Sequence, residues 1–309
     1  MAKNMNRRTF LKYQVKGGLW LTAAASGLSF PKNILADTGP DIAVAKGSPA
    51  AATRAAVEML GGMKNFVKKG NKVVIKPNMS FDTPPERASN THPEVVRELA
   101  VLCKEAGASR IMILDNPLRQ PEVCLDISGI AAACKAIDDR MIQMITDSSL
   151  FQETPIPDSA SMSKTDIMKD VLRADVLIAA PVAKSHSGAG VSLSMKGMMG
   201  LIYNRRVMHT LDLHTAIVDM ASVLKADLSV IDATRVLSTG GPGGPGKVLK
   251  PDMVIASKDM VAADAYAVSS FEWYGKKYKP EQVRHIREAH ERGLGRMDLE
   301  NLKIKTVSV

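Results

Sequence analysis

The sequence contains few cysteines, and their spacing argues against one class of cofactor. Cys103, Cys124 and Cys134 are the only three among 309 residues, and no C-x-x-C pair is present. An iron–sulfur cluster normally requires four thiolates at close spacing, so we expect no such cluster within this chain. Apolar residues recur at helical spacing around Cys103, which indicates a buried core cysteine. Cys124 and Cys134 could pair in an oxidising compartment, and the sequence leaves that open.

Aromatic residues are scarce, and most of the excess positive charge is confined to one end. Aromatic side chains make up 4% of the chain, which leaves few surfaces on which nucleobases could stack. The formal net charge is +9, but six of the 41 Lys and Arg residues and none of the 32 acids lie in residues 1–36. The remainder carries 35 basic and 32 acidic residues, a net charge of +3. Nucleic acid is therefore not an expected partner.

No apolar run near the N-terminus is long enough for a stable membrane span. Residues 17–30 form a stretch of 14 residues interrupted by glycines, whereas a span needs about 20 apolar residues. Arg7-Arg8-Thr9-Phe10-Leu11-Lys12 precedes this stretch, and Leu35-Ala36 follows it. A paired arginine, a moderately apolar core and a small-residue exit in this order are typical of a twin-arginine export signal.

We therefore predict a signal peptide in residues 1–36, cleaved after Ala36, and a periplasmic protein exported in folded form. The twin-arginine export machinery is the implied partner. A cytoplasmic amphipathic N-terminus and an uncleaved anchor are the alternatives. Residues 37–309 are predicted to form a single domain, and their number is sufficient for a continuous core.

Short apolar runs alternate with amphipathic stretches along residues 37–309. The runs at 72–76, 110–115, 175–180 and 228–232 are typical of strands buried on both faces, and a last strand is expected at 302–309. Helices are expected at 53–67, 93–106, 127–137, 164–173, 213–224, 262–273 and 280–292, and an exposed loop at 148–163. This alternation predicts an α/β fold with a mainly parallel sheet flanked by helices.

Polar side chains follow the predicted strands where each strand ends. They are Lys76 and Asn78, Asp115, Lys184 and His186, and Asp232. Any one of them could be an ordinary cap or turn residue. Ligands bind beyond the carboxyl ends of the strands in open parallel sheets, so four such clusters together predict a shared ligand cleft there.

Residues 181–200 carry the strongest chemical signal. His186 ends a predicted strand, a loop of small residues follows, and Lys196 comes ten residues later beside Gly197 and Gly200. Neither the Walker pattern nor G-x-G-x-x-G in a βα turn is present. A histidine here can be an acid, a base or a metal ligand, and a lysine can be a cation or, when desolvated, a nucleophile. A structural turn with a solvent-exposed lysine is the alternative.

Two further features are weaker evidence for a functional site. His209 and His214 are separated by five residues rather than the four of a helical metal-binding pair, so a metal site at these histidines is one hypothesis among several. Residues 240–246 are too rich in Gly and Pro for regular structure and form either a wall of the cleft or a flexible surface loop.

Several of these motifs together resemble domain-of-unknown-function family 362. They include Val74-Ile75-Lys76-Pro77-Asn78, Lys184-Ser185-His186, Ser194-Met195-Lys196-Gly197 and Ser257-Lys258-Asp259, and the resemblance extends over about residues 40–308. Relatives often carry a ferredoxin-like iron–sulfur module, which this chain lacks. The resemblance therefore implies a separate iron–sulfur or redox partner.

A second resemblance is narrower. The run from Ala174 to Lys196 is similar to the N-terminal domain of the nickel-pincer lactate racemases. This likeness implies that His186 is an acid/base, that Lys196 carries the cofactor, and that His209 or His214 lies near the metal. The second catalytic histidine of that family has no counterpart here, because Asp115-Asn116-Pro117 occupies its place, which argues against racemase activity.

These observations predict an enzyme that acts on a small anionic metabolite, as an oxidoreductase or isomerase, with a metal ion or a nickel-pincer-like cofactor. His186 and Lys196 are the predicted catalytic residues, and Lys76, Asn78, Asp115, Lys184 and Asp232 are predicted to bind the cofactor. A non-catalytic periplasmic binding protein or a cofactor-assembly protein could use the same cleft and is the alternative.

Overall fold

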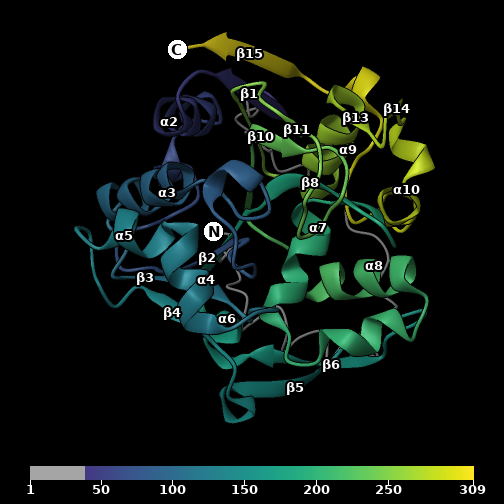
Figure 1. The fold of residues 1–309 in the computed structure, drawn as a ribbon, viewed down its shortest axis with the longest axis horizontal. Helices are drawn as coiled ribbons and strands as arrows, with labels where there is room; N and C mark the ends of the chain where they lie inside the picture. Colours follow the sequence, from purple (N-terminus) through teal and green to yellow (C-terminus); the bar gives the residue numbers. More distant parts are fainter. Residues whose placement is uncertain (1–38) are drawn as a thin grey trace, which may run out of the picture.

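The computed structural model describes residues 39–309, so the predicted export signal in residues 1–36 lies outside the described part (Figure 1). A large sheet crosses the molecule in the order β15-β1-β12-β10-β7-β2-β3-β4. Its strands are β1 (Ile42–Lys46), β2 (Lys72–Pro77), β3 (Arg110–Asp115), β4 (Ile142–Met144), β7 (Val176–Ala180), β10 (Leu228–Leu237), β12 (Met253–Ser257) and β15 (Ile304–Ser308). The short strands β8 (Val182–His186) and β11 (Val248–Leu249) pair with β10, and β9 (Gly190–Ser192) pairs with β8.

Most of the sheet is parallel. β2 pairs in parallel with both β3 and β7, β3 with β4, and β7 with β10. β12, which the sequence did not predict, runs antiparallel to both β1 and β10. The predicted α/β fold with a mainly parallel sheet is confirmed, and so are the four buried strands that now form β2, β3, β7 and β10.

Helices cover both faces of this sheet (Figure 1). Alternate residues of β2 point to opposite faces: Val73 and Ile75 belong to one core cluster, and Val74 belongs to the other. Helices α2 (Pro49–Met59), α3 (Pro93–Glu105) and α5 (Ile130–Cys134) contribute to the first cluster, and α8 (Leu213–Val223), α9 (Met260–Ser270) and α10 (Arg284–Glu291) contribute to the second. The remaining helices are α4 (Pro121–Ser128), α6 (Lys169–Arg173) and α7 (Ser194–Gly197). Short 3-10 helices cover Met63–Asn65, Pro85–Arg87, Ser148–Leu150, Met198–Leu201, Arg205–His209, Pro280–Gln282 and Leu299–Asn301.

The prediction was wrong between residues 148 and 168, whereas the second half of the helix expected at 164–173 forms α6 (Lys169–Arg173). Half of the expected helix at 164–173 is strand β6 (Lys164–Met168), which pairs antiparallel with β5 (Phe151–Pro155) inside the expected loop. Phe151, Ile167 and Met168 are buried in this hairpin, and Asp219 of α8 accepts hydrogen bonds from the backbone N–H groups of residues 160–162. Pairing within the hairpin, together with its contact to Asp219 of α8, therefore overrode the local helical spacing.

Smaller differences lie at element ends. The helices expected at 53–67, 127–137 and 280–292 are each split by a turn, and α9 ends at Ser270 before a small hairpin of β13 (Glu272–Trp273) and β14 (Lys276–Lys277).

Cys103, Cys124 and Cys134 are buried free thiols, so Cys124 and Cys134 are not paired. Within residues 39–309, no helix combines the length and apolar character that a membrane crossing requires.

Candidate functional site: a cationic cavity at the strand ends

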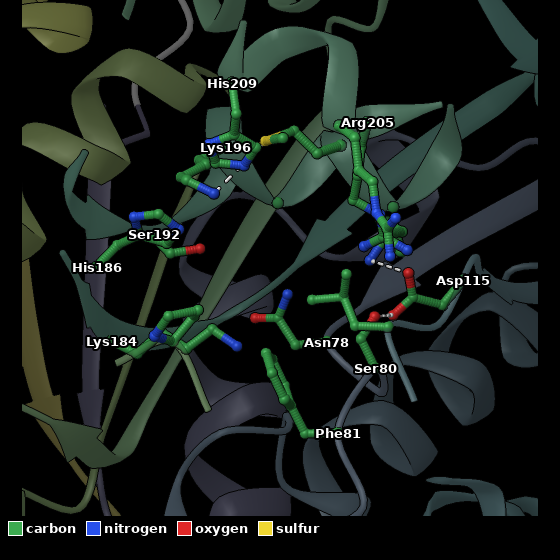
Figure 2. Close-up of a pocket in the computed structure, with 17 residues that line it drawn as sticks. Asn78, Ser80, Phe81, Asp115, Lys184, His186, Ser192, Lys196, Arg205 and His209 are labelled. Atoms are coloured by element: carbon green, nitrogen blue, oxygen red, sulfur yellow. Dashed lines mark hydrogen bonds and ion pairs between the residues drawn. The ribbon is translucent and has the colours of Figure 1, made fainter. Parts of the chain in front are cut away.

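The carboxyl ends of β2, β3 and β8 converge on one cavity of about 120 Å³. Figure 2 shows the side chains that surround it. Parallel strands end at the same edge of a sheet, so residues that follow β2 and β3 lie side by side. The lining residues are Lys76, Asn78, Ser80, Phe81, Asp115, Leu118, Lys184, His186, Ser192, Lys196, Gly197, Met199, Gly200, Arg205, Arg206, His209 and Pro242. We call this space the cationic cavity.

Seven of the nine residues proposed from the sequence line the cationic cavity: Lys76, Asn78, Asp115, Lys184, His186, Lys196 and His209. Asp232 and His214 are not among the lining residues. Asp232 instead accepts hydrogen bonds from Arg235 Nη2 at 2.8 Å and from the backbone N–H of His92, which caps α3, at 2.7 Å. Its buried carboxylate thus ties β10 to the start of α3, and a ligand-binding role for Asp232 has no support from this position.

Lys76 and Asp115 form a buried ion pair at the base of the cationic cavity. Lys76 Nζ lies 3.2 Å from Asp115 Oδ1, and Asp115 Oδ2 accepts hydrogen bonds from Ser80 Oγ and the backbone N–H of Met79. Burial lowers the pKa of Lys76, and the charge of Asp115 opposes this effect. A Cβ atom on Gly200 would lie 2.1 Å from Asp115 Oδ1, so the pair requires glycine at that position.

Lys184 lies on β8 and is also held by its neighbours. Its Nζ donates to the backbone oxygen of Ser89 at 2.5 Å and lies 4.7 Å from the centre of the Phe81 ring. Burial is the main reason that its pKa falls well below the usual value, and the charges of Lys196 and Lys76 act in the same direction.

Lys196 lies on α7 and has a different environment. The hydrogen-bond partner of its Nζ within the described chain is the thioether sulfur of Met199, at 3.5 Å, which is a weak acceptor. Burial, together with the charge of Arg205, lowers the pKa of Lys196 to about 7. A substantial fraction of this amine is therefore uncharged at neutral pH.

The backbone fixes the tautomer of His186. Its Nδ1 accepts hydrogen bonds from the backbone N–H groups of Gly188 at 3.1 Å and Ala189 at 3.2 Å. Burial, and then the charge of Lys196, lower the pKa of His186 to about 3, so the ring is neutral in the physiological range. Because Nδ1 is the acceptor, Nε2 carries the hydrogen. His186 is therefore a hydrogen-bond donor toward the cationic cavity rather than a base.

Arg205 and Arg206 follow no strand and were not expected at the site. Both lie in the 3-10 helix Arg205–His209 and line the cationic cavity, and Arg205 Nη2 donates to the backbone oxygen of Asn116. Ser80, Phe81 and Ser192 were missed as well, whereas Pro242 belongs to residues 240–246, for which a wall of the cleft was one of the two alternatives. The adjacent arginines and the nearby His209 were a visible signal, but only the fold brings this segment over the ends of β2 and β3.

The charges around the cationic cavity are unbalanced. Three lysines and two arginines line it, namely Lys76, Lys184, Lys196, Arg205 and Arg206, and Asp115 is the carboxylate among the lining residues. Like charges held together in a desolvated site raise the free energy of the unliganded state, and an anion relieves that cost. The arrangement is thus suited to a small anion.

The described residues do not fit a metal centre. His209 stacks against His186 with ring centres 6.2 Å apart, whereas His214 pairs with His285, their Nδ1 atoms 3.3 Å apart. Within residues 39–309, no group of three or more His, Cys, Asp or Glu side chains converges in a way that could hold a metal ion. His186 also presents N–H rather than a lone pair, which a metal ligand needs. A metal at His209 and His214 stays a prediction without structural support.

Fold and site together define an α/β protein with a cationic ligand cavity at the carboxyl ends of parallel strands. The chain belongs to the DUF362 family (domain of unknown function), whose sequence profile matches residues 73–269. The thylakoid-associated protein sll1697 of Synechocystis sp. is 28% identical over 228 residues, which are 71% of this chain and 68% of that protein.

Among solved structures, the lactate racemase apoprotein from Thermoanaerobacterium thermosaccharolyticum is similar with a TM-score of 0.43 and 16% sequence identity. The match covers 72% of this chain and 55% of the racemase, so the chain spans only about half the length of that protein.

Proposed function

We propose that this protein is an enzyme that binds a small organic anion in the cationic cavity, with Lys196 as its reactive amine. The observation that carries this proposal is the charge imbalance, in which three lysines and two arginines face one carboxylate. The volume of about 120 Å³ suits a compact ligand, since an engineered cavity of about 150 Å³ holds benzene.

A catalytic role is favoured over binding alone by the state of Lys196. An anion-binding protein gains most from charged lysines, whereas the pKa of Lys196 is lowered to about 7. Enzymes tune lysines in this direction by burial and by neighbouring cations, because the neutral amine is the nucleophile or base. The non-catalytic binding protein remains the second candidate, and it predicts binding without turnover.

The proposed location is the periplasm, reached in folded form through the twin-arginine route. The Arg7-Arg8 pair and the apolar stretch at 17–30 support it. The relative named for its association with thylakoids is consistent with a protein that functions outside the cytoplasm. A separate redox partner is part of this proposal only if catalytic turnover requires an electron donor or acceptor.

Anion binding can be tested by calorimetry with sulfate and oxalate. Arg205→Gln should weaken binding by about tenfold or more, because a charge-assisted hydrogen bond contributes about 1.5–3 kcal/mol. Arg140→Gln is the matched control, since the Arg140 side chain is 88% exposed and lies outside the cationic cavity. Absence of anion binding in the wild type, or equal affinities in the two variants, would refute the proposal.

A further inference from the structure

The three buried lysines of the cationic cavity differ in what holds their amino groups. Lys76 faces the carboxylate of Asp115 and donates to the backbone oxygen of Pro77, and Lys184 donates to the backbone oxygen of Ser89. Among the described residues, Lys196 Nζ has no oxygen acceptor, and its hydrogen-bond partner is the sulfur of Met199. Lys196 is thus the lysine whose lone pair is available for a reaction.

The surroundings of Lys196 match the needs of an attack on a carbonyl group. His186 lines the cationic cavity, and Nε2 is the ring nitrogen that carries a hydrogen, because Nδ1 accepts from two backbone N–H groups. A fixed neutral donor of this kind stabilises the negative charge that develops on a carbonyl oxygen. The hydroxyl group of Ser192 lies on the same side of the view as Lys196 (Figure 2).

The opposite side of the cationic cavity supplies the cations for an anionic group. In Figure 2, Arg205 lies across the open space from His186 and Ser192. Arg205 and Arg206 both line the cavity, and a guanidinium group binds a carboxylate with two parallel hydrogen bonds. The charge of Arg205 also acts on Lys196, so these groups suit a ligand whose carboxylate is attached directly to its carbonyl carbon.

We propose that Lys196 forms an imine with a small 2-oxo acid bound in the cationic cavity; this inference rests on the proposed function and names its substrate class. The size of the cavity, about 120 Å³, suits compounds such as pyruvate or glyoxylate. Burial and the charge of Arg205 also keep the amine substantially unprotonated at neutral pH, because they lower the pKa of Lys196 to about 7.

The reaction requires no oxidant or reductant. The lone pair of Lys196 Nζ forms a bond to the carbonyl carbon, and the π electrons of the carbonyl group move to its oxygen, where His186 Nε2–H donates a hydrogen bond. A proton passes from the new ammonium nitrogen to that oxygen and gives a carbinolamine. Loss of the second amine hydrogen and the hydroxyl group as water forms the C=N bond. The resulting imine withdraws electrons from the neighbouring carbon atoms, as in enzymes with Schiff-base lysines.

Reductive trapping tests this proposal directly. The purified protein is incubated with pyruvate or glyoxylate and sodium cyanoborohydride, and intact mass and peptide mapping locate the reduced adduct. We expect one adduct, on Lys196, which forms faster as the pH rises toward 7 and is lost in Lys196→Arg. Lys104→Arg is the control, because Lys104 is an exposed lysine on α3 and its replacement should leave trapping unchanged.

The outcomes separate this proposal from the proposed function. Peptide mapping of the wild-type protein locates the adduct without any variant, so poor folding of Lys196→Arg would not affect the conclusion. An adduct on Lys184 or spread over surface lysines would overturn the imine proposal. Sulfate and oxalate binding in the calorimeter without any trapping of pyruvate or glyoxylate would also overturn it, while the proposed anion site would stand. Failure of all four anions to bind would refute both proposals.

Discussion

Lys76 and Asp115 form an ion pair across two neighbouring parallel strands, with Nζ and Oδ1 3.2 Å apart and both side chains buried. Each residue lies at the carboxyl end of its strand, so the pair joins β2 to β3 where the cationic cavity begins. It also gives one of the five lining basic residues a carboxylate partner. Of the other four, Arg205 and Arg206 are the main cations that face a ligand, because burial lowers the pKa values of Lys184 and Lys196.

Removal of the charge on Asp115 should destabilise the protein. In Asp115→Asn, Lys76 keeps its buried position without a carboxylate, and we expect the free energy of unfolding to fall by about 3 kcal/mol. Urea unfolding at pH 7 measures this change. Arg140→Ala removes an exposed ion pair and should change stability by less than about 1 kcal/mol. Similar losses in both variants would mean that the Lys76–Asp115 pair has no special role.

Gly200 should tolerate no side chain. Its Cβ atom would lie 2.1 Å from Asp115 Oδ1 and 2.4 Å from Lys76 Cε, so Gly200→Ala should cost about 1–3 kcal/mol and weaken sulfate binding. Gly197→Ala is a matched control for stability, because the nearest atom to its Cβ is Pro181 Cβ at 3.6 Å. The two variants can be compared by thermal melts, and equal stability would show that the ion pair can move away from a new methyl group.

Sulfate affinity should depend on pH through Lys196. The pKa of Lys196 is lowered to about 7, so the amine gains a proton as the pH falls through this value. A charged amine attracts sulfate, whose own charge is constant in this range, so affinity should rise below pH 7 and fall above it. His186, with a pKa of about 3, should contribute no step near its usual value.

Calorimetric titrations between pH 5 and pH 9 measure this profile, a range chosen to bracket the pKa of about 7. Lys196→Met should bind sulfate more weakly at pH 5 and lose the step near pH 7. A step of wild-type size in Lys196→Met would assign the titration to another group.

Two substitutions of His186 separate its contribution to the turn from its contribution to the ligand. Asn at position 186 keeps a short acceptor for the N–H groups of Gly188 and Ala189 but loses the donor in the cationic cavity. Gln keeps a longer donor but loses that acceptor. We expect His186→Asn to lose binding or activity with little change in stability, and His186→Gln to lose about 1–3 kcal/mol through unpaired N–H groups.

Thermal melts and ligand titrations on both His186 variants provide the measurements. If His186→Asn binds ligand as tightly as the wild type, His186 has only a structural role in the turn.

Export should depend on the paired arginines. Replacing both Arg7 and Arg8 with lysine should leave full-length precursor in the cytoplasm, because the twin-arginine route requires this pair. Fractionation followed by immunoblotting detects the precursor, with Lys3→Arg and Lys12→Arg as controls that preserve charge. Unchanged export of the doubly substituted precursor would point to another route.

Local sequence patterns were sufficient to predict the central strands of the sheet and many residues of the candidate site. The apolar runs that became β2, β3, β7 and β10 were recognisable because strands buried on both faces need continuous apolar residues. Since parallel strands end at a common edge, Lys76, Asp115 and Lys184 could be expected to share one cavity before any coordinates were known.

The tertiary structure decided what depends on contacts between distant segments. The β5–β6 hairpin formed where a helix was expected, because Phe151 and Ile167 are buried there and the distant Asp219 of α8 accepts hydrogen bonds from its turn. Arg205 follows no strand, and only the packing of its 3-10 helix over the strand ends brings it to the cationic cavity. Asp232 was expected at a strand end, as Asp115 is, but β10 continues to Leu237, so Asp232 lies within the strand and accepts hydrogen bonds from Arg235 and the start of α3. A pattern along the chain states which residues are polar at a strand end, whereas the direction of each side chain depends on the partners that the folded neighbours supply.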